Sequence, residues 1–259
     1  MQTYGQYCPM SRAAEVFAER WTPIIVRNLM AGCCTYTQIS AGAPGLSRTL
    51  LTTRLRQLQH KGVVQTTPKL EGRGVVYELT AAGWDLLGVL VALGEWGEKW
   101  VELGREHSDP LLVLWAWCTM HLARDRLPDR RVVVRFDFPD QPSDKRRLWL
   151  LIADGDAELC TKPTRFDEDL LVEMDAMTLA RWHLCQIEWA AARRAGWIRI
   201  AGPRTLARAL PTWNLRHDIE KFRVETQRRR TGNRAESDET ESLVRLGDEI
   251  AEIPNSLRR

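Results

Sequence analysis

The sequence lacks the segments that would place a protein in or across a membrane. No charged stretch followed by an apolar run opens the chain, and no apolar run reaches the roughly 18 residues that a membrane-spanning helix needs. The longest candidate, residues 111–117, has only the length of a core helix segment. We therefore expect a cytoplasmic protein with reduced thiols and no membrane partner.

Cysteine and histidine are sparse, and they are not arranged as metal ligands. None of the 6 cysteines belongs to a C-x-x-C pair or has a histidine at metal-ligand spacing. Patterns of catalysis are missing as well, because there is no Ser-His-Asp order, no pair of acid–base carboxylates and no phosphate-cradling glycine loop. Gly72-x-Gly74 fits a turn tip, and His121 and His183 fit core or surface positions. We predict no metal, no cofactor and no enzymatic activity.

Negative charge is absent from residues 46–61, the stretch LSRTLLTTRLRQLQHK. Its leucines at i, i+4 and i+7 predict a helix with one buried face. Ser47 suits the N-cap of this helix, and Gly62 suits its end. The other face combines threonines, an amide and arginines, which suits DNA because phosphates repel carboxylates. Taken alone, this composition fits a DNA-facing helix and a basic solvated face equally well.

Charge is distributed unevenly along the 259 residues, although the net charge of +3 is mild. Residues 1–80 contain 9 Lys and Arg against 4 Asp and Glu, a net charge of +5, whereas residues 214–259 contain 10 of each kind. The positive excess therefore accompanies the helix at 46–61, as attraction to DNA requires. The length of the chain suggests two domains.

Three shorter helical patterns precede the basic helix, and tight turns join them. A series of helices whose last member is basic predicts a helix-turn-helix arrangement. The preceding patterns cover residues 11–20, 21–31 and 36–43.

A β-hairpin is predicted directly after Gly62, where the apolar period changes from 3.6 to 2. Its strands are expected at residues 63–67 and 75–79, and its tip carries Lys69 and Arg73 between glycines. A basic hairpin after such a helix is a wing that would lie along the DNA backbone or minor groove. The long apolar helix expected at 81–103 then exposes more apolar surface than one small domain covers, which predicts a dimer.

Several residues form a pattern across residues 7–100: Cys8-Pro9, Trp21, Leu51-Thr52, Arg54-Leu55, Leu58, Gly62, Tyr77, Leu79, Thr80 and Gly83. In this pattern the chain resembles the HxlR family of bacterial transcriptional regulators. The resemblance implies a homodimer that binds pseudo-palindromic, double-stranded operator DNA and represses or activates transcription. The wing at Gly72-Arg73-Gly74 departs from relatives that have a longer, proline-containing segment. A cysteine at the position of Cys8 senses oxidants in some relatives, and an inert buried cysteine is the alternative.

Residues 108–213 have a different pattern, with an apolar helix at 109–126, four strands, then helices and a last strand. This order predicts a sheet with helices packed on one face. The strand-to-helix turn at Asp175, the segment 196–202 and the closing Leu210-Pro-x-Trp213 resemble the sterol carrier protein-type domain. The resemblance implies a hydrophobic tunnel for a lipid-like or other apolar ligand. The expected strands are 132–138, 148–153, 157–161, 170–174 and 197–201.

The sequence therefore predicts an α+β fold, with an N-terminal winged helix-turn-helix domain followed by a sterol carrier-like sheet-and-helix domain. We expect residues 1–104 to bind DNA and dimerise, residues 105–213 to bind an effector, and residues 214–259 to form a charged, partly disordered tail. The favoured function is that of a dimeric, sequence-specific transcriptional regulator that responds to an apolar small molecule. The alternatives are a lipid-binding or lipid-transfer protein with a dimerising N-terminal domain, and a regulator that senses oxidants through Cys8. A second domain that has lost its ligand and only stabilises the dimer is a further possibility.

Candidate site residues follow from these interpretations. The residues expected to contact DNA lie on the basic helix and the wing, and they are Ser47, Arg48, Thr49, Thr52, Thr53, Arg54, Arg56, Gln57, Lys69 and Arg73. Arg54 could instead pair within the fold. The residues expected to line a ligand cavity are Trp115, Trp149, Trp182 and Trp189, and core packing is the alternative explanation for these four.

Overall fold

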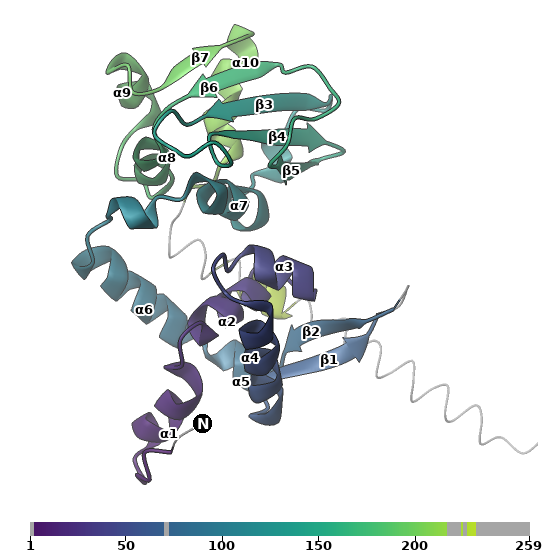
Figure 1. The fold of residues 1–259 in the computed structure, drawn as a ribbon, viewed down its shortest axis with the longest axis vertical. Helices are drawn as coiled ribbons and strands as arrows, with labels where there is room; N and C mark the ends of the chain where they lie inside the picture. The colour runs from purple at the N-terminus through teal and green to yellow at the C-terminus, as the bar shows by residue number, and fades with distance from the viewer. Residues whose placement is uncertain (1–2, 70–72, 217–223, 225–226, 232–259) are drawn as a thin grey trace, which may run out of the picture.

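Two separate hydrophobic cores organise the chain in the computed structural model (Figure 1). The structure describes residues 3–69, 73–216, 224 and 227–231. One core lies among the helices and hairpin of the N-terminal half, which we call the winged-helix part (α1 to α6). The other lies between a sheet and its helices, which we call the sheet part (α7 to η3). The expected tail, 214–259, lies largely outside the described residues.

The winged-helix part begins with four helices, as the sequence predicts. α1 and α2 each begin with a proline in the first turn, where the missing N–H costs nothing. Thr35 and Gln38 form a reciprocal capping box at the start of α3, with the Thr35 side chain accepting from the Gln38 amide. These helices are α1 (Pro9–Phe17), α2 (Thr22–Met30), α3 (Tyr36–Ala41) and α4 (Arg48–His60).

The predicted hairpin is confirmed. β1 (Val64–Pro68) and β2 (Val75–Leu79) pair antiparallel, in a register that runs from Val64 opposite Leu79 to Pro68 opposite Val75. The Lys69 amide donates to the Gly74 carbonyl at 3.2 Å, which continues the pairing toward the tip. Residues 70–72 lie outside the described residues.

The single long helix predicted at 81–103 is wrong, because the structure has two helices, α5 (Ala81–Asp85) and α6 (Leu87–Trp100). A Cβ at Gly83 would lie 2.3 Å from the Val63 carbonyl oxygen, so α5 packs directly on the chain that enters the hairpin. This close packing fixes the direction of α5. Leu86 separates the two helices, and α6 then runs toward the sheet part (Figure 1).

The sheet part has five strands in the order β5-β4-β3-β6-β7. The central pair β3 and β6 is parallel, and the other pairs are antiparallel. All five strands lie within the segments predicted from the sequence, apart from one-residue extensions at the starts of β4 and β5. Their bounds are β3 (Val132–Asp137), β4 (Arg147–Ala153), β5 (Asp156–Cys160), β6 (Leu170–Glu173) and β7 (Arg199–Ala201).

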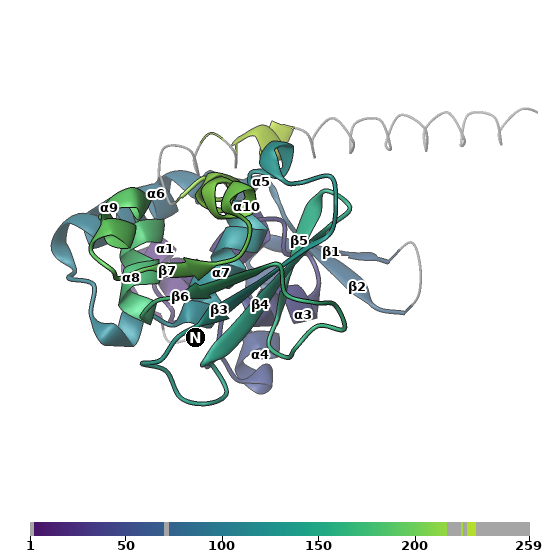
Figure 2. The same ribbon diagram turned by 90° about the horizontal axis from the view of Figure 1, so that it is seen from above.

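Helices of the sheet part pack on one face of this sheet, as Figures 1 and 2 show. Val132, Val134 and Phe136 of β3 point into the core that these helices share with the sheet. The α+β prediction, with helices on one face, is therefore confirmed at this level. The helices are α7 (Pro110–Met120), α8 (Ala176–His183), α9 (Trp189–Arg194) and α10 (Arg204–Ala209), with short 3₁₀ turns η1 (Arg105–His107), η2 (Arg124–Arg126) and η3 (Leu210–Trp213).

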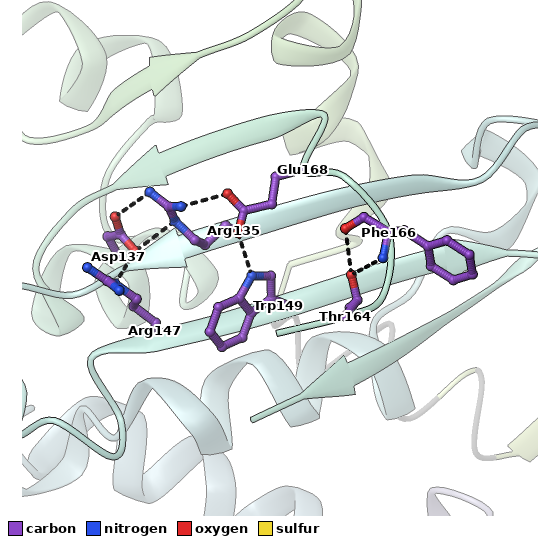
Figure 3. Close-up of polar contacts among 7 residues, drawn as sticks. All are labelled: Arg135, Asp137, Arg147, Trp149, Thr164, Phe166 and Glu168. Carbon is purple, nitrogen blue, oxygen red and sulfur yellow. Dashed lines mark hydrogen bonds and ion pairs between the residues drawn. The ribbon is translucent and has the colours of Figure 1, made fainter. Parts of the chain in front are cut away.

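The opposite face of the sheet carries a network of charged side chains, drawn in Figure 3. Arg135 of β3 donates to Asp137 at 3.1 Å and to Glu168 at 2.6 Å. Glu168 in turn accepts from the indole of Trp149 at 2.8 Å. Because side chains alternate along a strand, these residues point away from the helices. The network ties the segment before β6 to the outer face of the sheet.

Contact between the two parts is made by α7. The ring of Trp115 packs against the core of the winged-helix part, with the Arg27 guanidinium 5.8 Å from the ring centroid. A Cβ at Gly42 would lie 2.3 Å from this ring, so only glycine leaves room for it. This contact brings α7 against α2 and the end of α3.

Within the described part of the chain, no helix is both long and apolar enough to cross a membrane. No group of three or more potential metal ligands forms there either.

Candidate nucleic-acid interface

The basic helix forms as α4, with the caps that the sequence predicts. The Ser47 hydroxyl accepts a hydrogen bond from the Leu50 amide at 3.3 Å, and Gly62 adopts a φ of 69° just after the helix. Leu51, Leu55 and Leu58 are buried, so one face of α4 is fixed in the core. The opposite face is thereby held toward solvent.

Residues Arg48, Thr49, Thr53 and Arg56 are exposed on this outer face, and Thr52 is half-buried. The Thr52 hydroxyl donates to the Arg48 carbonyl at 3.0 Å, and the Thr53 hydroxyl donates to the Thr49 carbonyl at 2.9 Å. Because both hydroxyl protons are donated inside the helix, the two threonine side chains present oxygen lone pairs and methyl groups outward. Such groups can accept from base amino groups and contact a thymine methyl.

A hydrogen bond joins α3 to α4. Tyr36, the first residue of α3, donates its phenolic hydroxyl to the Arg48 carbonyl at 2.9 Å. The hairpin is tied to the same helix, since the Gln59 amide donates to the Thr66 hydroxyl at 3.1 Å. Neither bond was predicted from the sequence, because no local pattern pairs these side chains. The Thr35 capping box was also missed, although its spacing is a known signal.

Arg54 does not belong to the outer face, and its contacts match the alternative that it pairs within the fold. Its guanidinium lies 2.5 Å from the Glu19 carboxylate and donates to the Gln57 side chain at 2.8 Å. The Arg54 side chain is only 14% exposed. Gln57 therefore also forms a hydrogen bond within the fold, on the side of α4 that faces the end of α1. These two residues join helices within the fold.

The wing places one further cation at the surface. Arg73 is exposed and Lys69 is half-buried, on either side of the tip. Figure 1 shows the hairpin projecting beside α4. A cationic side chain at this place can reach the DNA backbone when α4 occupies a groove.

Comparison with known proteins gives the family of this region. Residues 16–123 match the model of the HxlR-like helix-turn-helix family. The HTH-type transcriptional regulator sll1512 of Synechocystis is 33% identical over 100 residues, which cover 38% of this chain and 73% of that protein. The regulator YvaP of Bacillus subtilis is 31% identical over 101 residues, covering 38% and 93% respectively. The regulator YodB of Bacillus subtilis is 30% identical over 100 residues, covering 38% and 88%.

The chain belongs to the HxlR-like helix-turn-helix family.

Membership in the HxlR-like family makes this chain a DNA-binding transcriptional regulator, and these relatives give no support to the lipid-transfer alternative. The matched residues include α2 to α7, and α4, the helix expected to read DNA, lies within them. The match ends at residue 123, and the whole sheet of the sheet part lies beyond it.

Cys8 of this HxlR-like chain occupies the N-cap position of α1. Hydrogen bonds from the Ser11 and Met10 backbone amides lower the pKa of the Cys8 thiol below its ordinary value. Cys33, by contrast, is buried, and burial raises its pKa to about 11. The geometry therefore favours the thiolate at Cys8 and disfavours it at Cys33.

All four tryptophans proposed to line a ligand cavity pack elsewhere in the HxlR-like chain. Trp182 and Trp189 lie in the core, with ring centroids 4.6 Å apart. Trp149 lies on the sheet face opposite the helices, under Glu168 (Figure 3). Trp115 contacts the winged-helix part. Strand alternation explains the position of Trp149, and the fit of large rings into a core explains Trp182 and Trp189. The structure gives no support to a role of the four tryptophans in ligand binding.

Proposed function

We propose that two copies of this HxlR-like chain bind one operator duplex, with α4 of each copy in a major groove and each hairpin beside the backbone. The exposed face of α4 supports this proposal most directly. Arg48 and Arg56 offer charge for phosphates or guanine, and Thr49, Thr52 and Thr53 offer short groups for base edges. None of these exposed positions carries a carboxylate.

The test is selection of duplexes from a random library by the purified protein, followed by titration of the selected site at several salt concentrations. We expect the logarithm of the affinity to fall linearly with the logarithm of salt, because each phosphate contact releases counterions. A selected site that is a two-fold repeat, with half-sites about one helical turn apart, would match a dimer. Binding that is insensitive to salt, or the absence of any enriched sequence, would overturn the proposal.

A dimer is supported by the apolar stripe on the outer side of α6. Val89, Leu93, Trp96 and Trp100 recur at i, i+4, i+7 and i+11, and 48%, 48%, 59% and 65% of their respective surfaces are exposed. A stripe of this kind on a helix is paired in most proteins, and large exposed rings are typical of interfaces. Tyr7 and Met10 near α1 are exposed as well. We assign the partner of this stripe to a second copy of the chain.

The boundaries at 104 and 213, and the likeness of the sheet part to the sterol carrier protein type, remain part of this proposal. The arrangement of five strands with helices on one face is compatible with that type. We propose that the sheet part receives the signal that adjusts operator binding.

Cys8 supports a second candidate signal, oxidation. A thiol with a lowered pKa at a helix N-terminus reacts faster than an ordinary thiol near neutral pH. Treatment with a thiol oxidant should then change operator affinity in the wild-type protein and not in Cys8→Ser. Equal responses of both proteins would remove this candidate.

A further inference from the structure

An apolar cavity of about 260 Å³ lies where the two parts of the molecule meet. Its walls come from α6, α7 and α8, and Arg27 of α2 borders it. The walls are mostly aliphatic, and include Leu90, Leu112, Val113 and Met120. A concave apolar site with a few polar groups is the ordinary form of a small-molecule site. The cavity lies outside the sheet-and-helix core, and none of the four tryptophans considered above lines it.

Arg27 is the charged group at this cavity. The Arg27 guanidinium donates to the Asn28 side chain at 2.9 Å and to the Gly42 carbonyl at 3.0 Å, both of which are uncharged. Burial lowers the pKa of Arg27, and no carboxylate among the described residues offsets that effect. Buried charges in proteins are normally paired with an opposite charge. Among the residues that the structure describes, this cation therefore has no carboxylate as a partner.

Three histidines, His107, His121 and His183, are the remaining polar side chains that line the cavity. His121 and His183 line it, are 4% and 5% exposed, and meet edge to face with centroids 4.9 Å apart. The Asn214 carbonyl accepts from the Arg216 amide, so the Asn214 amide nitrogen faces His183 Nδ1 at 2.9 Å. Within the described part of the chain, no aspartate or glutamate lines the cavity.

We propose that this cavity binds a small apolar monocarboxylate, with its hydrocarbon body among the aliphatic walls and its carboxylate on Arg27. The volume suits a molecule of roughly 10–15 non-hydrogen atoms, below the size of typical drug-sized ligands. An ion pair with Arg27 in a partly dry site is stronger than one at the surface. Cations and neutral alcohols of the same shape are disfavoured, because they leave the guanidinium unpaired.

The position of the cavity makes its occupant a regulator, and this step rests on the proposed function. Leu90 and Val91 of α6 line the cavity, while Val89, Leu93 and Trp96 of the same helix form the proposed dimer stripe. Arg27 belongs to α2, whose Ile25, Val26 and Leu29 lie in the core of the winged-helix part. A ligand that binds one arrangement of α2, α6 and α7 better than another shifts the distance between the two α4 helices of the dimer.

Calorimetric titration of the full-length protein with decanoate and with decan-1-ol tests the site. We expect decanoate to bind at least about tenfold more tightly than the alcohol, as a charge-assisted hydrogen bond in a buried site implies. Arg27→Gln should lose that preference, and Ala116→Leu, which fills the cavity, should weaken both probes. Arg193→Gln, on the exposed end of α9, is the matched control and should bind as the wild type does.

Equal binding of decanoate and decanol, no binding of either, retention of the preference in Arg27→Gln, or undiminished binding of both probes by Ala116→Leu would overturn the proposal. Circular dichroism of each variant shows whether it is folded, so that loss of binding can be distinguished from unfolding. Arg27→Lys is the variant that preserves the charge. Operator affinity is measured separately with and without decanoate. If decanoate binds as expected while no operator is found, the proposed function fails and the ligand site stands. If the operator is bound and decanoate is not, the ligand site fails alone.

Discussion

The Arg54 guanidinium and the Glu19 carboxylate lie 2.5 Å apart and join the middle of α4 to the segment between α1 and α2. Arg54 is 14% exposed and Glu19 is 35% exposed. Replacing Arg54 by Met leaves a partly buried carboxylate without its partner. We expect Arg54→Met to lower the free energy of unfolding by about 1–2 kcal/mol, between the values for surface and buried pairs. Urea unfolding measures this change, and unaltered stability would contradict the structural role.

Arg48 should behave in the opposite way, because it is exposed at the start of α4 and makes no ion pair among the described residues. We expect Arg48→Ala to leave the urea midpoint unchanged. It should weaken operator binding and reduce the slope of affinity against salt by about one, if Arg48 contacts a phosphate. Arg105→Ala, in the exposed turn η1, is the control for loss of one positive charge. Equal effects of both substitutions would indicate only a general electrostatic contribution.

Trp96 lies in the exposed stripe of α6, with 59% of its surface accessible in the single chain. We expect Trp96→Glu to shift the protein from dimer to monomer, because it places a charge in an apolar interface. Light scattering after gel filtration measures the mass. Trp197, 52% exposed at a distant site before β7, gives the matched control Trp197→Glu, which should stay dimeric. A wild-type protein that is already monomeric would remove the proposed dimer.

Gly42 should be intolerant of a side chain. Its Cβ would lie 2.3 Å from the Trp115 ring and 2.6 Å from the Asn28 amide, and both of these groups are held by neighbours. We expect Gly42→Ala to destabilise the protein by about 1–3 kcal/mol through overpacking. Gly88→Ala in α6 is the control, since a Cβ there meets nothing within 4 Å. That substitution should be neutral or stabilise the helix by up to about 1 kcal/mol. A stable Gly42→Ala would show that the Trp115 contact can move.

Cys8 should form its thiolate at lower pH than a free thiol, because backbone amides at the start of α1 stabilise the anion. A lowered pKa increases the thiolate fraction at every pH near or below the ordinary value, and the advantage disappears well above it. Iodoacetamide labelling of the Cys8 peptide, followed by mass spectrometry across pH, should give a midpoint below that of N-acetylcysteine. Coinciding profiles would contradict this expectation.

Much of the fold follows from local sequence patterns. Ser47, the leucines of α4 and Gly62 predict that helix to within about two residues, because cap, buried face and end all agree. The strands of the sheet part are equally predictable, since each is a short apolar run between turn residues. The break between α5 and α6 at Leu86 is not predictable from a local pattern. It depends on how closely Gly83 approaches Val63, a contact between elements.

The candidate site is less predictable than the fold. Arg54 and Arg56 are both arginines on one helix, and only the position of Glu19 decides that the first turns inward. Tryptophan at helical spacing is compatible with a core and with a cavity, and Trp182 and Trp189 pack as core. The cavity beside Arg27 is formed by helices from both parts of the chain, so no single stretch of sequence carries its signature.

The parallel pairing of β3 with β6 has a consequence for how the chain acquires its structure. Val134 pairs with Leu170, so the centre of the sheet forms only after a long intervening segment has been closed into a loop. The helix-turn-helix region depends mainly on neighbours in sequence and should form sooner during synthesis. A ribosome-bound nascent chain would then acquire its DNA-reading surface before the half of the molecule that we propose controls it.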